Sequence, residues 1–446
     1  MSNETNQLGK KARDKFSSKM GFVIACIGSA VGMGNIWMFP YRVGEFGGAA
    51  FLVPYIVFVV LLGMSGIVGE ITLGRTMKTG PLGSFKKALE MRGKKGGNII
   101  GLIPVIGSLA TAIGYTVVMS WILKFFVGSI TGDVTKASDS GAYFGNLAVS
   151  FGAVPWHVIV VLVTFALMVF GIAKGIEKVN KFMMPAFFFL FVIIAIRVAV
   201  LPGASAGYSF MFDADWGAIA SPKTWIFALG QAFFSLSLAG SGTVVYGSYL
   251  GDNEDIVSGA KYIAIFDTLA AFVAALVIIP AVFAFGMDPA AGPPLMFITM
   301  PSIFKMMPFG HLIAIFFFTA VMFAGFTSLV NLYETPIEAL QEKFGFSRKV
   351  SVGIILAIGL GIGLFIEDGA TVSAWMDVVS IYIVPLGAIL AAVMVYWVCG
   401  KGWATKHAQI GREKPIPAYF EPLSRYVFCG VAIIVYILGI AFGGIG

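Results

Sequence analysis

Two short stretches of the chain place glycines and side-chain oxygens in the middle of long apolar runs. The first is residues 28–35 (GSAVGMGN) and the second is residues 235–242 (SLSLAGSG). Glycine costs a helix interior about 1 kcal/mol per residue, so both stretches predict a broken helix. The freed carbonyl groups favour a cation, and the freed N–H groups at a helix start favour a carboxylate. Close packing of helices through small residues is the alternative interpretation of either stretch taken alone.

One carboxylate stands out for a similar reason. Asp267 lies within the apolar run AIFDTLAAFV. A charged side chain near the middle of a membrane span costs a few kcal/mol or more unless it is paired, so it is a functional candidate by default. The alternative is an aspartate whose side chain reaches one edge of the membrane. We therefore expect Asp267 to belong to the site that the two broken helices form.

The composition identifies the elements that must position these residues. Of the 446 residues, 58% are hydrophobic and only 12% are charged. Soluble domains carry about twice that share of charge, so a soluble enzyme, a secreted disulfide scaffold and a disordered protein are excluded. The three cysteines have no metal-ligand spacing. We expect an all-α integral membrane protein whose surroundings are the lipid bilayer.

Apolar runs long enough to cross a bilayer predict eleven transmembrane helices. Most of the 30 basic residues fall at the N-terminus and in the loops after the even-numbered spans. Basic loops stay on the cytoplasmic side. We therefore interpret the net charge of +7 as a signal for the orientation of the chain in the membrane and not as a sign of nucleic-acid binding. The protein is expected in the cell membrane, with a cytoplasmic N-terminus and an extracellular C-terminus. The spans are 20–43, 50–73, 98–127, 155–173, 180–201, 224–250, 260–286, 310–334, 350–366, 372–398 and 424–443.

The spans divide into two blocks of similar length, each with five helices. Five is an odd number, so the second block enters the membrane inverted relative to the first. Interrupted helices at matching positions of two inverted blocks, here helices 1 and 6, point to a secondary transporter with a site near the midplane. The expected divisions are a cytoplasmic segment (1–19), the first repeat (20–201), an outer loop (202–223), the second repeat (224–398), an inner loop (399–423) and one extra helix (424–446).

Five motifs make the chain resemble the neurotransmitter:sodium symporter family, over residues 13–398. The resemblance is to its bacterial eleven-helix branch, similar to transporters of aromatic or hydrophobic amino acids. It implies import of an L-amino acid by alternating access, coupled to sodium at two sites, with no enzymatic activity. Sodium is the only metal expected. The motifs are 28–41 (GSAVGMGNIWMFPY), 47–55 (GGAAFLVPY), 70–75 (EITLGR), 230–237 (GQAFFSLS) and 324–328 (AGFTS).

The resemblance also assigns residues to three sites. Sodium site 1 takes Ala30, Asn35, Ser235 and Asp267, and sodium site 2 takes Gly28, Val31, Ala324, Thr327 and Ser328. The expected substrate-binding residues are Ala30, Met33, Gly34, Thr111, Tyr115, Phe234, Ser235, Ser237 and Gly240.

Departures from the family pattern refine the expectation. Many members have asparagine at position 267, and animal members also bind chloride. Asp267 would supply that negative charge, which predicts no chloride requirement. Glycine at position 240 replaces a phenylalanine of relatives that carry small amino acids, so we expect a larger, aromatic substrate such as tyrosine or tryptophan.

The gates also depart from the pattern. Met38 replaces the arginine that closes the outer gate in most relatives, opposite Asp377. Arg42 lies one helical turn beyond Met38, and we expect it, or water, to substitute. Arg13 and Glu342 match the inner gate pair of the family.

Other functions remain as alternatives. A symporter for another small amino acid or an amine would fit the same pattern. An ion channel needs a continuous polar pore, and no repeated filter sequence is present. The string GASAG at 203–207 matches a hydrolase nucleophile elbow, but that motif requires a strand-to-helix turn and a histidine–acid pair. No sequence feature sets the oligomeric state.

Overall fold

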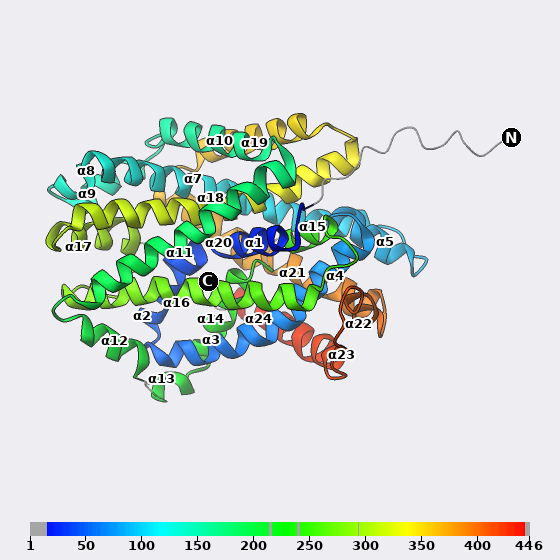
Figure 1. Cartoon of the computed structure of the whole chain (residues 1–446). Helices are drawn as coiled ribbons and strands as arrows, with labels where there is room; N and C mark the ends of the chain where they lie inside the picture. The colour runs from blue at the N-terminus through cyan, green and yellow to red at the C-terminus, as the bar shows by residue number, and fades with distance from the viewer. Residues whose placement is uncertain (1–15, 214–215, 239–240, 293, 442–446) are drawn as a thin grey trace.

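A computed structural model describes residues 16–213, 216–238, 241–292 and 294–441. Its regular elements are helices (Figure 1). In the first half these are α1 (Lys19–Ala30), η1 (Gly34–Met38), α2 (Phe39–Glu45), α3 (Ala49–Leu62), η2 (Gly63–Ile67), α4 (Val68–Met77), α5 (Pro81–Glu90), α6 (Gly97–Ile100), α7 (Leu102–Thr131), α8 (Asp133–Lys136), α9 (Ser140–Gly145), α10 (Val154–Met168), η3 (Ile172–Ile176), α11 (Glu177–Ala199), α12 (Ala204–Phe212) and α13 (Trp216–Ala220), where η marks a π-helical segment.

The second half continues with the same kind of element. It contains α14 (Pro222–Ser235), α15 (Gly242–Ser248), α16 (Ile256–Ala284), η4 (Leu295–Thr299), α17 (Met300–Met306), α18 (Gly310–Phe344), α19 (Arg348–Phe365), α20 (Gly369–Val378), η5 (Val379–Ile383), α21 (Val384–Val393), η6 (Met394–Val398), α22 (Trp403–Ala408), α23 (Phe420–Pro422), η7 (Leu423–Phe428) and α24 (Cys429–Ala441).

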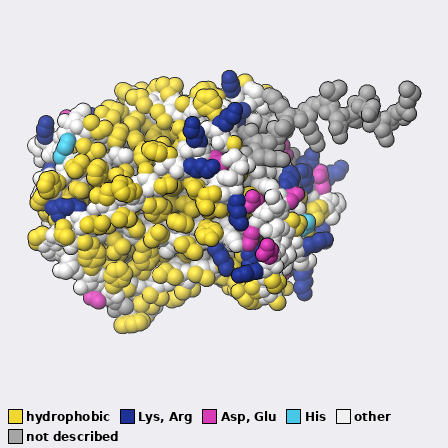
Figure 2. Space-filling view, in the orientation of Figure 1, with side chains coloured by type: hydrophobic (Ala, Val, Ile, Leu, Met, Phe, Trp, Pro, Cys, Tyr) yellow, Lys and Arg dark blue, Asp and Glu magenta, His cyan; other side chains and the backbone are white. Residues whose placement is uncertain are grey.

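The expected all-α membrane architecture is confirmed. Among the described residues, eight continuous helices are long and apolar enough to cross a membrane, and the bent pair formed by α1 with η1 and α2 makes nine. The two other predicted spans fall on α10, which has 15 residues, and on the interrupted pair α14 and α15. Hydrophobic side chains cover most of the visible surface, and basic side chains gather toward the end where α5 and α22 lie (Figure 2).

Some element boundaries differ from those that hydropathy predicts. The fifth span begins at Ile172 rather than near residue 180. Its first turns carry Lys174, Glu177 and Lys181, and charges conceal a helix from a hydropathy window although they do not prevent it from forming. The proline-rich segment 288–309 lies between two of the predicted spans and contains η4 and α17, and α17 packs against α18.

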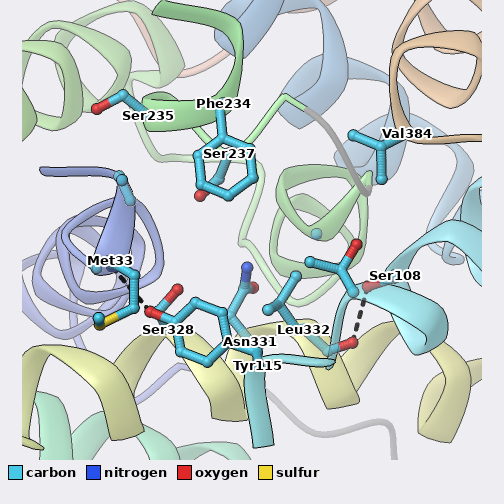
Figure 3. Close-up of a pocket in the computed structure, with 15 residues that line it drawn as sticks. Met33, Ser108, Tyr115, Phe234, Ser235, Ser237, Ser328, Asn331, Leu332 and Val384 are labelled. Atoms are coloured by element: carbon cyan, nitrogen blue, oxygen red, sulfur yellow. Dashed lines mark hydrogen bonds between the residues drawn. The ribbon is translucent and has the colours of Figure 1, made fainter. Parts of the chain in front are cut away.

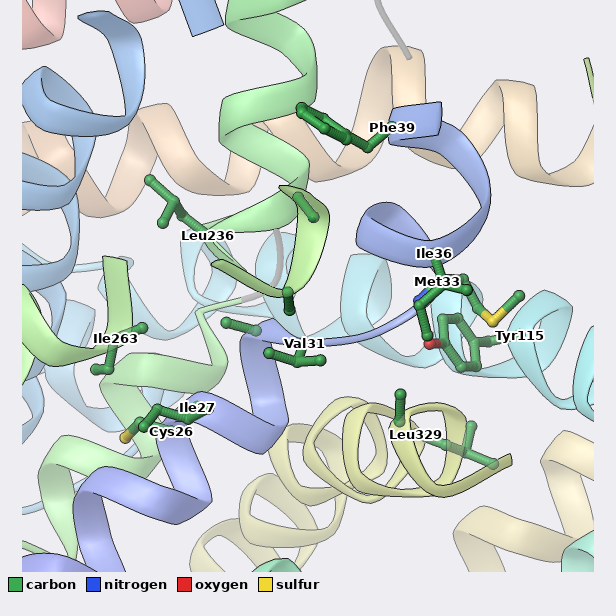
Figure 4. Close-up of a cluster of buried hydrophobic side chains, with 14 of the residues drawn as sticks. Cys26, Ile27, Val31, Met33, Ile36, Phe39, Tyr115, Leu236, Ile263 and Leu329 are labelled. Atoms are coloured by element: carbon green, nitrogen blue, oxygen red, sulfur yellow. The ribbon is translucent and has the colours of Figure 1, made fainter. Parts of the chain in front are cut away.

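The first predicted break lies between α1 and η1. The two parts bend by 49°, and Val31 leaves the helix in an extended conformation with ψ of 109°. Figure 4 shows the thin connection between the two halves, enclosed by buried side chains that include Ile27, Val31 and Leu329. The small residues of this stretch keep the break compact, so that its backbone polar groups lie inside the bundle.

The second break lies between α14 and α15. It runs from Leu236 to Ser241, although residues 239–240 lie outside the described part. Ser237 and Ser241 have positive φ angles of 54° and 51°. These angles lie in the left-handed region and therefore interrupt a right-handed helix. Long helices surround both breaks: α1 contacts α11, α16 and α18, and α15 contacts α4 and α18.

Candidate substrate and ion site

Asn35, Ser235 and Asp267 converge from η1, α14 and α16. The Asn35 amide Nδ2 donates to Asp267 Oδ1 at 2.7 Å and to Ser235 Oγ at 3.0 Å. The Ser235 hydroxyl donates to both carboxylate oxygens of Asp267, at 3.0 and 2.9 Å. The structure thus brings together the three side chains assigned to sodium site 1.

This cluster holds its carboxylate without a basic partner. Asp267 is fully buried, and its hydrogen-bond donors in the described part of the chain, Asn35 and Ser235, are neutral. A buried charge requires compensation by an opposite charge. The remaining member of the predicted set, Ala30, lies at the end of α1 and lines the neighbouring cavity. Hydroxyl and carboxylate oxygens suit a hard monovalent cation, whereas Asn35 presents its Nδ2 to them and its Oδ1 accepts the Gly32 N–H at 2.9 Å.

The residues assigned to sodium site 2 meet where α1 lies against α18. The Ser328 hydroxyl donates to the Ser29 carbonyl at 3.4 Å across the two helices. Thr327 Oγ1 donates to the Ala324 carbonyl at 3.0 Å. A methyl group on Gly28 would lie 3.1 Å from Thr327 Cβ. Four of the five predicted residues, Gly28, Ala324, Thr327 and Ser328, therefore lie at this contact, and Val31 is buried directly after α1.

A small cavity of about 40 Å³ opens beside the two breaks (Figure 3). At its wall, the Met33 backbone N–H donates to the Tyr115 hydroxyl at 2.9 Å, and the Ser237 hydroxyl donates to the Ser29 carbonyl at 2.8 Å. Eight of the nine residues predicted to bind substrate line this cavity, and the ninth, Gly240, lies outside the described residues. The eight are Ala30, Met33, Gly34, Thr111, Tyr115, Phe234, Ser235 and Ser237.

Sequence reasoning missed several residues of the cavity wall. The most informative is Asn331 on α18, which is 3% exposed and whose Oδ1 has no hydrogen-bond partner among the described residues. It follows Ser328 by three positions, which places both side chains on one helix face. That spacing was a usable signal, because Ser328 had already been assigned to a site. The other missed residues are Gly32, Ser108, Gly242, Leu332 and Val384.

A larger cavity of about 270 Å³ lies beside the first one, with Met33, Tyr115 and Phe234 lining both. Met38 and Asp377, both assigned to the outer gate, line this second cavity together.

Arg42, the expected substitute for the missing gate arginine, points elsewhere. Its Nη1 lies 2.7 Å from Glu45 Oε2, and its guanidinium lies over the Phe227 ring at 4.5 Å.

The inner-gate assignment concerns Arg13 and Glu342. Arg13 lies outside the described residues. Glu342, near the end of α18, accepts a hydrogen bond from the Thr79 hydroxyl.

Known proteins resemble this chain over most of its length. The family model for the sodium:neurotransmitter symporter family matches residues 13–146 and 140–441. An uncharacterised sodium-dependent transporter of Bacillus subtilis is 33% identical over 396 residues, which are 85% of this chain and 87% of the relative. Another, from Methanocaldococcus jannaschii, is 32% identical over 441 residues, covering 93% of this chain and 88% of the relative.

A solved structure matches over nearly the whole chain. It is the crystal structure of MhsT in complex with L-phenylalanine, with a TM-score of 0.86 and 32% sequence identity. The match covers 96% of this chain and 99% of MhsT.

Proposed function

Because the chain belongs to the sodium:neurotransmitter symporter family, we propose that it imports an L-amino acid with a large hydrophobic or aromatic side chain. Two sodium ions drive each import step, and chloride is not required. The protein works by alternating access around the broken helices, and the sodium gradient and membrane potential supply the energy, about 2.3 kcal/mol per charge per 100 mV.

The observation that carries this proposal is the buried carboxylate of Asp267. It receives three hydrogen bonds from the neutral side chains of Asn35 and Ser235, and its charge is compensated when sodium binds at site 1. The same carboxylate replaces the negative charge that chloride supplies in other members of the family. This is the basis for proposing chloride independence.

The substrate binds in the cavity beside the breaks. Its carboxylate meets the backbone N–H groups of Met33 and Gly34 together with the Tyr115 hydroxyl, and it also completes sodium site 1. Its amino group meets carbonyl groups at Ala30 and Phe234. These roles use the backbone N–H and carbonyl groups that two interrupted helices offer a zwitterion.

The rest of the cavity wall supports a large side chain with a polar tip. Phe234, Leu332 and Val384 are apolar, while Thr111 and Asn331 carry hydrogen-bonding groups. The Asn331 Oδ1 atom lacks a partner among the described residues and can accept the N–H of an indole or the O–H of a phenol. The bound L-phenylalanine of MhsT supports the same substrate class.

The remaining assignments follow from this function. We place the N-terminus in the cytoplasm, and the gathering of basic side chains at the end with α5 and α22 supports this. The repeats span 20–201 and 224–398. Met38 and Asp377 belong to the outer gate, while Arg13 and Glu342 belong to the inner gate.

Uptake by the purified protein in liposomes tests the proposal. Every standard L-amino acid is offered with a sodium gradient, and sodium and chloride are replaced separately by potassium and gluconate. We expect tryptophan, tyrosine or phenylalanine to accumulate only with sodium and equally well without chloride. Uptake that persists in potassium, or current without stoichiometric uptake, would contradict the symport proposal. Chloride-dependent uptake would contradict only the role of Asp267.

The Asn331→Leu variant tests whether Asn331 binds the polar tip of the substrate side chain. It should weaken tryptophan and tyrosine binding while phenylalanine binding stays within about twofold, since loss of one neutral hydrogen bond costs about 1 kcal/mol. Leu332→Ile is the matched control because it changes the shape of the same wall without changing its polarity. An equal loss for all three amino acids would contradict the role given to Asn331.

A further inference from the structure

The side chain of Asn180, on α11, has an orientation that its surroundings fix. It is 1% exposed, and its Nδ2 donates to the Ile176 carbonyl at 2.8 Å. This bond assigns the amide nitrogen and leaves Oδ1 on the opposite side of the group. There Oδ1 is buried and has no hydrogen-bond partner in the described part of the chain.

That oxygen faces Gly28, one of the residues assigned to sodium site 2. A methyl group on Gly28 would lie 1.7 Å from Asn180 Oδ1 and 3.1 Å from Thr327 Cβ. Three helices, α1, α11 and α18, therefore meet at this oxygen. Gly28 and Thr327 both belong to the second sodium site, whereas no role has been given to α11.

A buried carbonyl oxygen without a partner is unfavourable unless a donor or a cation satisfies it. The neighbouring Thr327 hydroxyl does not donate to this oxygen, because it is already directed at carbonyl groups of its own helix. Oxygen from an uncharged amide is a suitable sodium ligand, and unwound backbone near α1 supplies others.

We propose that Asn180 Oδ1 is an additional oxygen ligand of the second sodium site, on the side that faces α11. The inference rests on the proposed sodium-coupled function and adds a residue to it. It also connects the ion to η3, since the Asn180 amide is held by Ile176, the last residue of that π-helical segment. Movement of η3 would therefore move a sodium ligand.

A second contact, two helical turns earlier on α1, supports this connection between α1 and α11. A methyl group on Gly21 would lie 1.8 Å from Glu177 Oε1, and Gly21 and Gly28 are seven residues apart on α1, which places them on one face. Glu177 also accepts the backbone N–H of Ser17 at 2.7 Å. The two glycines thus allow α1 to pack closely against α11 over the two turns that end at the proposed sodium site.

The test measures sodium binding through thermal stability, without transport. The full-length protein is purified in detergent with saturating L-phenylalanine, and its melting temperature is followed while sodium gluconate replaces potassium gluconate. We expect Asn180→Leu to raise the sodium concentration for half-maximal stabilisation at least about fivefold. Asn180→Asp, which keeps an oxygen at this position, should stay within about twofold of the wild type.

Met184→Leu is the matched control, because Met184 is buried on the same face of α11 one turn later. A purely structural role for Asn180 would lower the melting temperature equally at every sodium concentration. That result, or an unchanged half-maximal concentration in Asn180→Leu, would overturn the inference. If Asn180→Leu does not fold, Asn180→Ala replaces it, since it removes the amide without adding bulk.

The outcome separates this inference from the proposed function. If sodium fails to stabilise the wild-type protein over potassium, the sodium-coupled function itself is contradicted. If the wild type responds and Asn180→Leu responds identically, only the role of Asn180 is lost.

Discussion

The Asn35 amide and the Asp267 carboxylate, separated by 232 positions in the sequence, lie 2.7 Å apart inside the bundle. Asn35 follows the break of the first interrupted helix, and Asp267 lies in α16, within the proposed second repeat. Asn35 Nδ2 also donates to the Asp267 backbone carbonyl at 3.0 Å. The segments η1 and α16 are therefore joined at the point where the first sodium ion is proposed to bind.

Replacing Asp267 with asparagine should weaken sodium coupling. The substitution keeps the size of the side chain but removes its charge, so we expect the sodium concentration for half-maximal uptake to rise about tenfold, equivalent to about 1.4 kcal/mol. This concentration is measured by following the uptake of L-phenylalanine into liposomes at increasing sodium concentrations. Asp288→Asn is the control, because Asp288 lies in an exposed loop, where its carboxylate accepts the Ala290 N–H at 2.8 Å. An unchanged sodium dependence in Asp267→Asn would remove Asp267 from the ion site.

Adding one methyl group to Gly28 should destabilise the protein. The methyl would lie 1.7 Å from Asn180 Oδ1, and relieving such an overlap in a packed core typically costs about 1–3 kcal/mol. The melting temperature of Gly28→Ala is expected to fall accordingly. Gly361→Ala on α19 is the matched control, because a methyl there meets nothing within 4 Å. Equal melting temperatures for the two variants would show that α1 does not pack against α11 in this way.

A buried pair between His157 and Glu367 should stabilise the contact between α10 and the loop before α20. His157 Nδ1 lies 2.9 Å from Glu367 Oε1, both side chains are fully buried, and Glu367 Oε2 accepts the Ala153 N–H at 3.2 Å. Replacing His157 with leucine leaves the buried carboxylate without this hydrogen bond, which costs about 1.5–3 kcal/mol for a bond to a charged group.

Thermal unfolding measures this loss, and the variant Asp368→Asn provides the control. Asp368 is the neighbouring residue and caps α20 through the Thr371 N–H at 2.9 Å, a role that asparagine fills equally well. A melting temperature of His157→Leu as high as that of Asp368→Asn would show that the pair contributes nothing to stability.

An arginine at position 38 should create the gate contact that this chain lacks. Met38 and Asp377 line the larger cavity beside the proposed substrate cavity. A guanidinium pairs well with a carboxylate. We expect Met38→Arg to slow the dissociation of radiolabelled L-phenylalanine from the purified protein by about tenfold, or 1.4 kcal/mol. Met38→Leu should dissociate like the wild type. If Met38→Arg is equally slow when combined with Asp377→Asn, the effect does not come from the proposed pair.

The two breaks and the buried carboxylate were predictable from the sequence because their signals are local, whereas the family resemblance assigned the other site residues. The glycines and serines at 28–35 and 235–242 mark both breaks, and Asp267 is conspicuous in its apolar run. The apolar runs also predict the spans, since a bilayer requires about 20 apolar residues for each helix. The charged residues Glu177 and Lys181 in the first turns conceal the true start of α11. Hydropathy measures the preference of side chains for an apolar phase and does not measure helix formation.

Only the tertiary structure decided which groups meet. Asn180 and Asn331 look like ordinary polar residues of two helices, and their unpartnered oxygens become evident only once α11 and α18 pack against α1 and the cavity. The pairing of Arg42 with Glu45 rather than Asp377 is likewise a matter of side-chain direction. Residue type and spacing determine local conformation and burial, whereas contacts between residues far apart in the chain depend on how the helices pack in three dimensions.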